Sequence, residues 1–176
     1  MPVDTYITIK DSENKEHRFK TKYLSKVLML KQMLSDIGVT EETYETADPI
    51  PIGSIDNETM TLVIKWLELH DEKPPKTDDE RNLEHLSRDV SDQDNALLDA
   101  IPNRIKLAAL INAAYYLEAR DLIDVLVKYT ANQLEGKTAE QMCEWMEVAP
   151  KSNERTREAS DDAGTTNGVA AKRERN

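Results

Sequence analysis

The sequence predicts a mixed α/β (α+β) fold, in which a small sheet packs with helices and further helices follow along the chain. Two patterns lead to this prediction. The first part of the chain alternates short strand patterns with helical patterns, whereas the part after about residue 103 is helical. Of the 176 residues, 39% are hydrophobic, which is enough to build one core in one domain.

The two N-terminal strand patterns form a predicted hairpin. Residues 6–10 alternate polar and apolar side chains, the period of a half-buried strand. Turn-forming residues at 11–14 then predict a return strand over 16–21. A helical pattern from about residue 24 to residue 37 ends before Gly38. Residues 49–52 are expected to form only a short edge strand, because their two prolines donate no backbone hydrogen bond.

The helix expected after Asp56, its predicted N-cap, has two apolar faces. One stripe consists of Met60, Val63, Ile64 and Leu67, and the other of Leu62, Trp66 and Leu69. Both faces of such a helix are expected to be buried. We expect one face to meet the sheet and the other to meet a second layer or a partner chain.

Residues 71–95 interrupt the helical pattern. Pro74 and Pro75 stop any helix. The segment contains nine acidic and four basic residues. The segment has few aliphatic side chains, so we interpret it as a solvated linker or insertion. An acidic docking segment is the alternative interpretation.

Three helices are expected in the C-terminal half. The first, about residues 105–117, is apolar nearly all round and is predicted to be a buried central helix. The second covers about 120–134, and the third begins at a capping box formed by Thr138 and Gln141. Residues 150–176 are polar and charged, and we expect them to be a disordered tail. The predicted parts are therefore 4–70, 71–95, 96–149 and 150–176.

Composition excludes several classes of function. The net charge of −11 argues against binding to nucleic acid or to an anionic membrane, because phosphates are repelled. No stretch reaches the roughly 18 consecutive apolar residues of a membrane-spanning helix. The single Cys143 cannot form an internal disulfide, which fits a reducing cytosolic or nuclear setting. No phosphate-binding loop or catalytic motif is present, and we expect no catalytic residues, no metal and no cofactor.

Several segments resemble, in family order, the S-phase kinase-associated (Skp) adaptor family of SCF ubiquitin ligases. They lie within residues 4–149 and include Val63-Ile64-Lys65-Trp66, the stretch from His70 to Pro75, residues 113–117 and residues 135–141. The resemblance implies a BTB/POZ fold followed by C-terminal F-box-binding helices. It also implies a non-catalytic adaptor in the cytoplasm and nucleus, which joins a cullin scaffold to F-box proteins in ubiquitin-dependent protein degradation.

The resemblance further implies two docking surfaces. The cullin-binding candidates are Trp66, Leu67, His70, Pro74 and Pro75. The F-box-binding candidates are Tyr116, Leu117, Leu122, Leu126, Leu134, Met142 and Trp145. The chain departs from the family where Tyr115 replaces an Asn, and the family's closing Asn-x-Trp helix has no counterpart. The alternative hypothesis is therefore a structural POZ protein that has lost F-box binding and forms a homo-oligomer.

Overall fold

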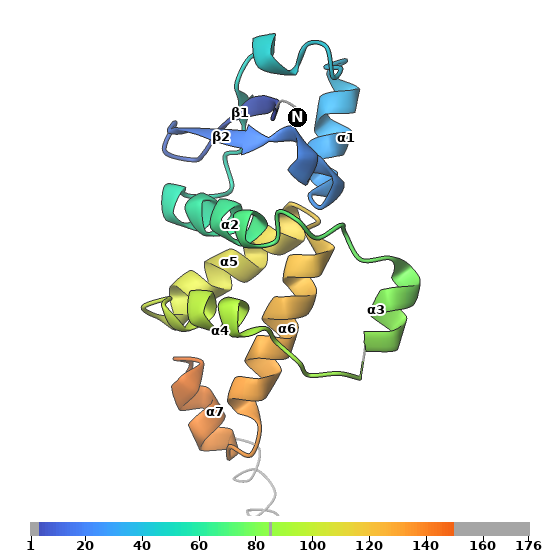
Figure 1. The fold of residues 1–176 in the computed structure, drawn as a ribbon. Coiled ribbons are helices and arrows are strands. Elements are labelled where there is room, and N and C mark those ends of the chain that lie inside the picture. The colour runs from blue at the N-terminus through green and yellow to red at the C-terminus, as the bar shows by residue number, and fades with distance from the viewer. Residues whose placement is uncertain (1–3, 85, 150–176) are drawn as a thin grey trace, which may run out of the picture.

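The computed structural model describes residues 4–84 and 86–149. Figure 1 shows a small sheet with α1 at one end of the molecule, α2 next to it, and α4, α5, α6 and α7 below. The fold is mixed α+β, as predicted, and it is consistent with the BTB/POZ-like fold that the resemblance implies. The predicted disordered tail lies outside the described residues.

The sheet has three strands in the order β2-β1-β3. Strands β1 (Tyr6–Lys10) and β2 (Glu16–Lys20) form the predicted antiparallel hairpin, with Ile7 opposite Phe19. Strand β3 (Ile50–Pro51) pairs parallel to β1 and lies at the edge, which confirms the expectation for the proline-containing segment. Ile7, Ile9 and Phe19 are buried, so this face of the sheet contributes directly to the core.

The first helix is shorter than its predicted extent. Residues Thr21–Ser25 form a 3-10 turn, and α1 covers only Leu28–Asp36. Val27, which precedes α1, leaves the helical conformation, so the two helical pieces cannot merge. The helix ends before the exposed Ile37, and Gly38 follows with a φ of 73°, the left-handed conformation that glycine adopts most easily. A further 3-10 turn, Tyr44–Thr46, lies in the loop before β3.

Helix α2 (Asn57–Leu69) lies between the sheet and the C-terminal helices (Figure 1). The side chain of Asp56 caps it as predicted, accepting a 2.8 Å hydrogen bond from the backbone N–H of Thr59. Both apolar stripes contribute buried residues, and α2 contacts α4 and α5. The second layer expected for this helix is therefore supplied by the same chain.

The segment 71–95 contains more regular structure than the predicted linker. Helix α3 (Asp78–Glu84) lies within it, and α4 (Asp92–Asp99) begins there. No residue of α3 is buried, so it is solvated as expected of an insertion. The side chain of Ser91 caps α4 by accepting a hydrogen bond from the backbone N–H of Asp94.

The three C-terminal helices are α5 (Arg104–Tyr116), α6 (Arg120–Leu134) and α7 (Ala139–Trp145), which confirms the predicted elements. Thr138 and Gln141 form the predicted capping box at the start of α7. Helix α5 is not buried all round, however, because Ile105, Asn112 and Tyr115 are exposed. No helix of the described residues is both long enough and apolar enough to cross a bilayer.

Candidate functional site

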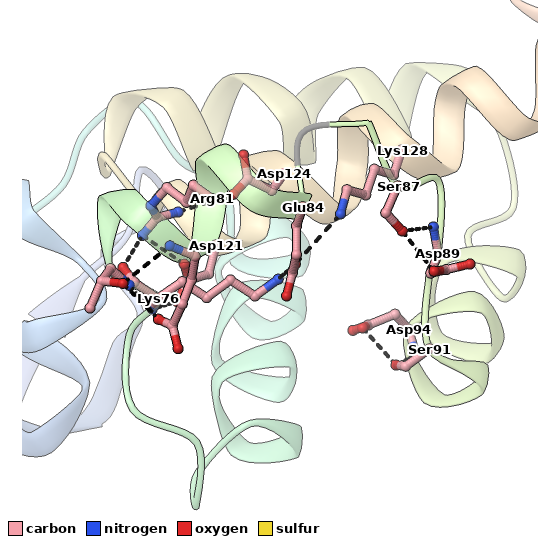
Figure 2. A network of polar contacts seen from close by, with 12 residues as sticks. Lys76, Arg81, Glu84, Ser87, Asp89, Ser91, Asp94, Asp121, Asp124 and Lys128 are labelled. Carbon is pink, nitrogen blue, oxygen red and sulfur yellow. Dashed lines mark hydrogen bonds and ion pairs between the residues drawn. The ribbon is translucent and has the colours of Figure 1, made fainter.

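A buried polar cluster joins the end of α2 to α4. Trp66 donates a hydrogen bond from its indole Nε1 to Oδ1 of Asp94, over 2.9 Å. The ring Nε2 of His70 lies 2.8 Å from the same oxygen, and the two rings pack with centroids 4.5 Å apart. Ser91 donates to the other carboxylate oxygen over 2.7 Å, as Figure 2 shows. One carboxylate on α4 therefore binds two side chains at the end of α2 and the Ser91 side chain that caps α4.

The charge of Asp94 is stabilised by these contacts. Burial raises the pKa of this carboxyl, but its hydrogen bonds with His70, Ser91 and Trp66 outweigh burial and hold the pKa below its ordinary value. Asp94 was not among the predicted site residues. Its partners on α2 lie 24 and 28 residues earlier in the chain, so no local sequence pattern identifies the cluster.

The end of α2 is also capped by a buried lysine. The ammonium group of Lys26 donates to the backbone carbonyl of His70, one of the carbonyls that a helix C-terminus leaves unpaired. Burial lowers the pKa of Lys26, whereas the nearby carboxylates of Asp121 and Asp71 partly oppose that effect. The segment between β2 and α1 is thereby joined to the last turn of α2.

Three members of the predicted cullin-binding set lie at this junction. Trp66, Leu67 and His70 are only 2%, 0% and 8% exposed, respectively. Trp66 and His70 point to Asp94 and Leu67 packs in the core, so all three side chains make their contacts within this chain. Their role in cullin binding stays a prediction. Pro74 is exposed and Pro75 half-buried in the loop that follows, and their role in cullin binding stays a prediction.

The predicted F-box-binding set also contains both buried and accessible side chains. Leu117, Leu122 and Leu126 are buried where α5 packs on α6, and their role in F-box binding stays a prediction. Their apolar side chains hold the two helices together. The other four candidates remain accessible: Tyr116 is exposed, whereas Leu134, Met142 and Trp145 are half-buried. Their contact with an F-box protein stays a prediction.

Helix α7 is joined to α5 through an aromatic contact. The guanidinium of Arg104, the first residue of α5, lies 4.1 Å from the ring centroid of Trp145. This is the geometry of a cation–π interaction. Trp145 therefore positions α7 and exposes only part of its ring to solvent.

An apolar stripe on α6 is only partly covered, with Ile123 and Leu134 half-buried. Ile123, Val127 and Leu134 lie on one side of this helix, and Val127 is 54% exposed. The buried stripe of Leu122, Leu126 and Tyr129 lies on another side. The sequence contained both stripes, but the predicted site included the buried one and omitted Val127. Further exposed apolar side chains on or next to these helices are Ile105, Tyr115, Met146 and Val148.

The described residues contain no group of three or more His, Cys, Asp or Glu side chains arranged to hold a metal ion. Chemically, what the C-terminal helices offer is apolar surface for another macromolecule.

Comparison with known proteins identifies relatives but no matching family model. The chain is 29% identical to the "E3 ubiquitin ligase complex SCF subunit sconC" of Arthroderma benhamiae over 137 residues, which cover 77% of this chain and 79% of the relative. It is 33% identical to the "Skp1-related protein" of Caenorhabditis elegans over 110 residues, which cover 62% of this chain and 61% of that protein. The sconC subunit of Talaromyces marneffei is 24% identical over 136 residues, covering 77% of this chain and 80% of the relative. With this fold and these relatives, the chain is similar to Skp-like subunits of SCF complexes.

Proposed function

We propose that the chain is an adaptor subunit of an SCF-type E3 ubiquitin ligase. It bridges a cullin scaffold to F-box substrate receptors in ubiquitin-dependent protein degradation. In this proposal it has no catalytic activity and no cofactor, and it acts in the cytoplasm and nucleus. The similarity to SCF subunits over about three quarters of the chain supports the role.

The apolar stripe on α6 is the observation that carries the F-box part of the proposal. Val127 is exposed and Ile123 and Leu134 are half-buried, although the helix already packs in the core on another side. Removing apolar surface from water favours association, so a partner that covers this stripe would gain stability from it. The half-buried Met142 and Trp145 on α7 extend the apolar character of this part of the chain.

The decisive experiment measures binding of a cullin N-terminal domain and of an F-box protein separately. The substitution Val127→Asp places a charge on the α6 stripe without entering the core. We expect it to weaken F-box binding about tenfold or more, because a charge is desolvated without a partner, and to leave cullin binding unchanged. Leu122→Asp is unsuitable for this experiment, since Leu122 is fully buried and the substitution would unfold the helix pair.

The matched control is Ile37→Asp, which alters a similarly exposed apolar residue at the end of α1. We expect Ile37→Asp to retain F-box binding. The reciprocal variant Pro74→Asp changes the exposed loop after α2 and is expected to weaken cullin binding only. Equal loss of both partners in Val127→Asp, or no loss of either, would contradict the assignment of the surfaces.

The same exposed side chains also favour a second candidate, a structural POZ protein that self-associates. A second copy would cover Val127 and its neighbours in place of an F-box protein. Light scattering of the purified full chain distinguishes the two. A stable dimer that persists in the presence of an F-box protein would favour self-association, whereas a monomer that binds the F-box protein supports the adaptor.

A further inference from the structure

A cavity of about 610 Å³ lies between α3 and the rest of the molecule. Its walls include Trp66 and His70 at the end of α2, Val125 and Lys128 on α6, and Leu83 and Glu84 on α3. Helix α3 stands to one side of the molecule beside α6 in Figure 1. The position of α3 therefore decides how far the cavity is open to solvent.

Ion pairs attach α3 to α6. The Nη2 atom of Arg81 lies 2.8 Å from Oδ1 of Asp121, and its Nη1 atom lies 3.0 Å from Oδ2 of Asp124. Glu84, at the other end of α3, lies 2.5 Å from Nζ of Lys76 and 3.7 Å from Nζ of Lys128. Figure 2 shows these charges in one row between the two helices.

Apolar contacts contribute little to this attachment. No residue of α3 is buried, and its one leucine, Leu83, is 84% exposed. Leu86, just beyond the helix, is 90% exposed. A helix of seven residues is not stable alone in water, so α3 depends on its ion pairs.

The side chains of Lys76, Glu84 and Asp124 are 36%, 47% and 37% exposed, so salt screens their attraction. Arg81 and Asp121 are 19% and 11% exposed, so salt screens this pair less.

We propose that α3 is a strap that ion pairs hold closed over the cavity and that opens as ionic strength rises, while the helices beneath it stay folded. Arg81 is the principal attachment, because its guanidinium spans two carboxylates of α6 and also donates to the backbone carbonyl of Lys76. Opening exposes the walls formed by Trp66 and Val125. The proposal is independent of cullin or F-box binding.

Hydrogen exchange of the full chain tests the strap at low and high NaCl, about 20 mM and 500 mM, which span weak to strong screening. We expect the α3 amides to exchange about tenfold faster at high salt, whereas the α6 amides keep their protection. Arg81→Met retains the apolar stem but removes the charge. At low salt, the α3 amides of Arg81→Met should exchange as fast as those of the unaltered chain do at high salt.

Arg88→Met is the matched control. Arg88 forms an ion pair with Glu135 over 2.8 Å, but both side chains are exposed and neither belongs to α3. We expect this variant to retain the salt response of the unaltered chain. A second readout is acrylamide quenching of Trp66 fluorescence in a Trp145→Phe background, which should increase with salt as the cavity opens.

Three results would overturn the strap. The first is α3 exchange that is independent of salt and of Arg81→Met. The second is exchange at the rate of an unfolded chain already at low salt, since α3 would then never be closed. The third is loss of α6 protection together with α3, because the salt response would then be unfolding of the whole helix pair.

Discussion

Two polar junctions of this molecule use the same chemistry in different surroundings. At the first, Asp94 binds Trp66 and His70 inside the molecule; at the second, Asp121 and Asp124 bind Arg81 beside α3. The contact distances are all between 2.8 and 3.0 Å. The side chain of Asp94 is 4% exposed, whereas those of Asp121 and Asp124 are 11% and 37% exposed.

The difference teaches that a contact distance does not determine how much a contact stabilises. When the buried junction loses its acceptor, the donors of Trp66 and His70 cannot reach water, and the full cost of their desolvation remains. When an exposed pair is broken, water and salt ions replace the lost partner. We therefore expect the first junction to control the stability of the fold and the second to control the position of one helix.

The largest expected effect comes from Asp94→Ala. Removing the carboxylate leaves the indole N–H and the ring of His70 without their acceptor, and should lower the free energy of unfolding by about 3 kcal/mol. Urea denaturation measures this change. Asp92→Ala is the control, since Asp92 is exposed in the same first turn of α4, and should cost less than about 1 kcal/mol. Equal losses of unfolding free energy in Asp94→Ala and Asp92→Ala would show that the buried carboxylate contributes no more than the exposed one.

Trp66→Phe tests one hydrogen bond of the buried junction, because it removes the indole N–H and keeps an aromatic ring beside His70. We expect a loss of about 1 to 2 kcal/mol in the free energy of unfolding, from one hydrogen bond and some buried area. Trp145→Phe should cost less, because Trp145 is only half-buried. A larger loss for Trp145→Phe would show that α7 contributes more than the α2–α4 junction.

The buried junction should also respond to acid. Because the folded-state pKa of Asp94 lies below its ordinary value of 3.8, its contribution is fully present above that pH and is lost as the pH falls through the folded pKa. Asp94→Asn should therefore lose less stability than the unaltered chain when acidified below about pH 4. Denaturation at pH 7 and at pH 3 checks this, and parallel losses in the two proteins would contradict it.

Arg81→Met should have the smallest effect on global stability, at most about 1 kcal/mol in urea denaturation at low salt. The effect should disappear at high salt, since screening already weakens these pairs in the unaltered chain. A loss as large as that of Asp94→Ala would show that α3 is part of the cooperative core.

Sequence periodicity and caps predicted most of the fold. Asp56 and Thr138 marked the starts of α2 and α7, because capping is a local interaction that short sequence patterns reveal. Helix α3 was not predicted, since its sequence has one leucine and no apolar stripe. Its position depends on Asp121 and Asp124, which lie about forty residues further along the chain.

The candidate site was less predictable than the fold. The sequence showed two apolar stripes on α6, but periodicity alone cannot decide which of them faces the core. The structure buries Leu122 and Leu126 and leaves Val127 exposed. Likewise, the pattern around Trp66 did not reveal its acceptor, because Asp94 lies 28 residues away on another helix. In both cases the missing information is tertiary packing.

The position of α2 has a consequence for synthesis of the chain. Helix α2 comes from the first half of the sequence, but its packing partners α4 and α5 come from the second half. Residues 4–70 therefore emerge from the ribosome before Asp94 and α5 do, with one apolar face of α2 uncovered. Such a face attracts chaperones and other nascent chains. Helix α2 can complete its packing only after α4 and α5 have emerged, so its burial depends on both halves of the chain.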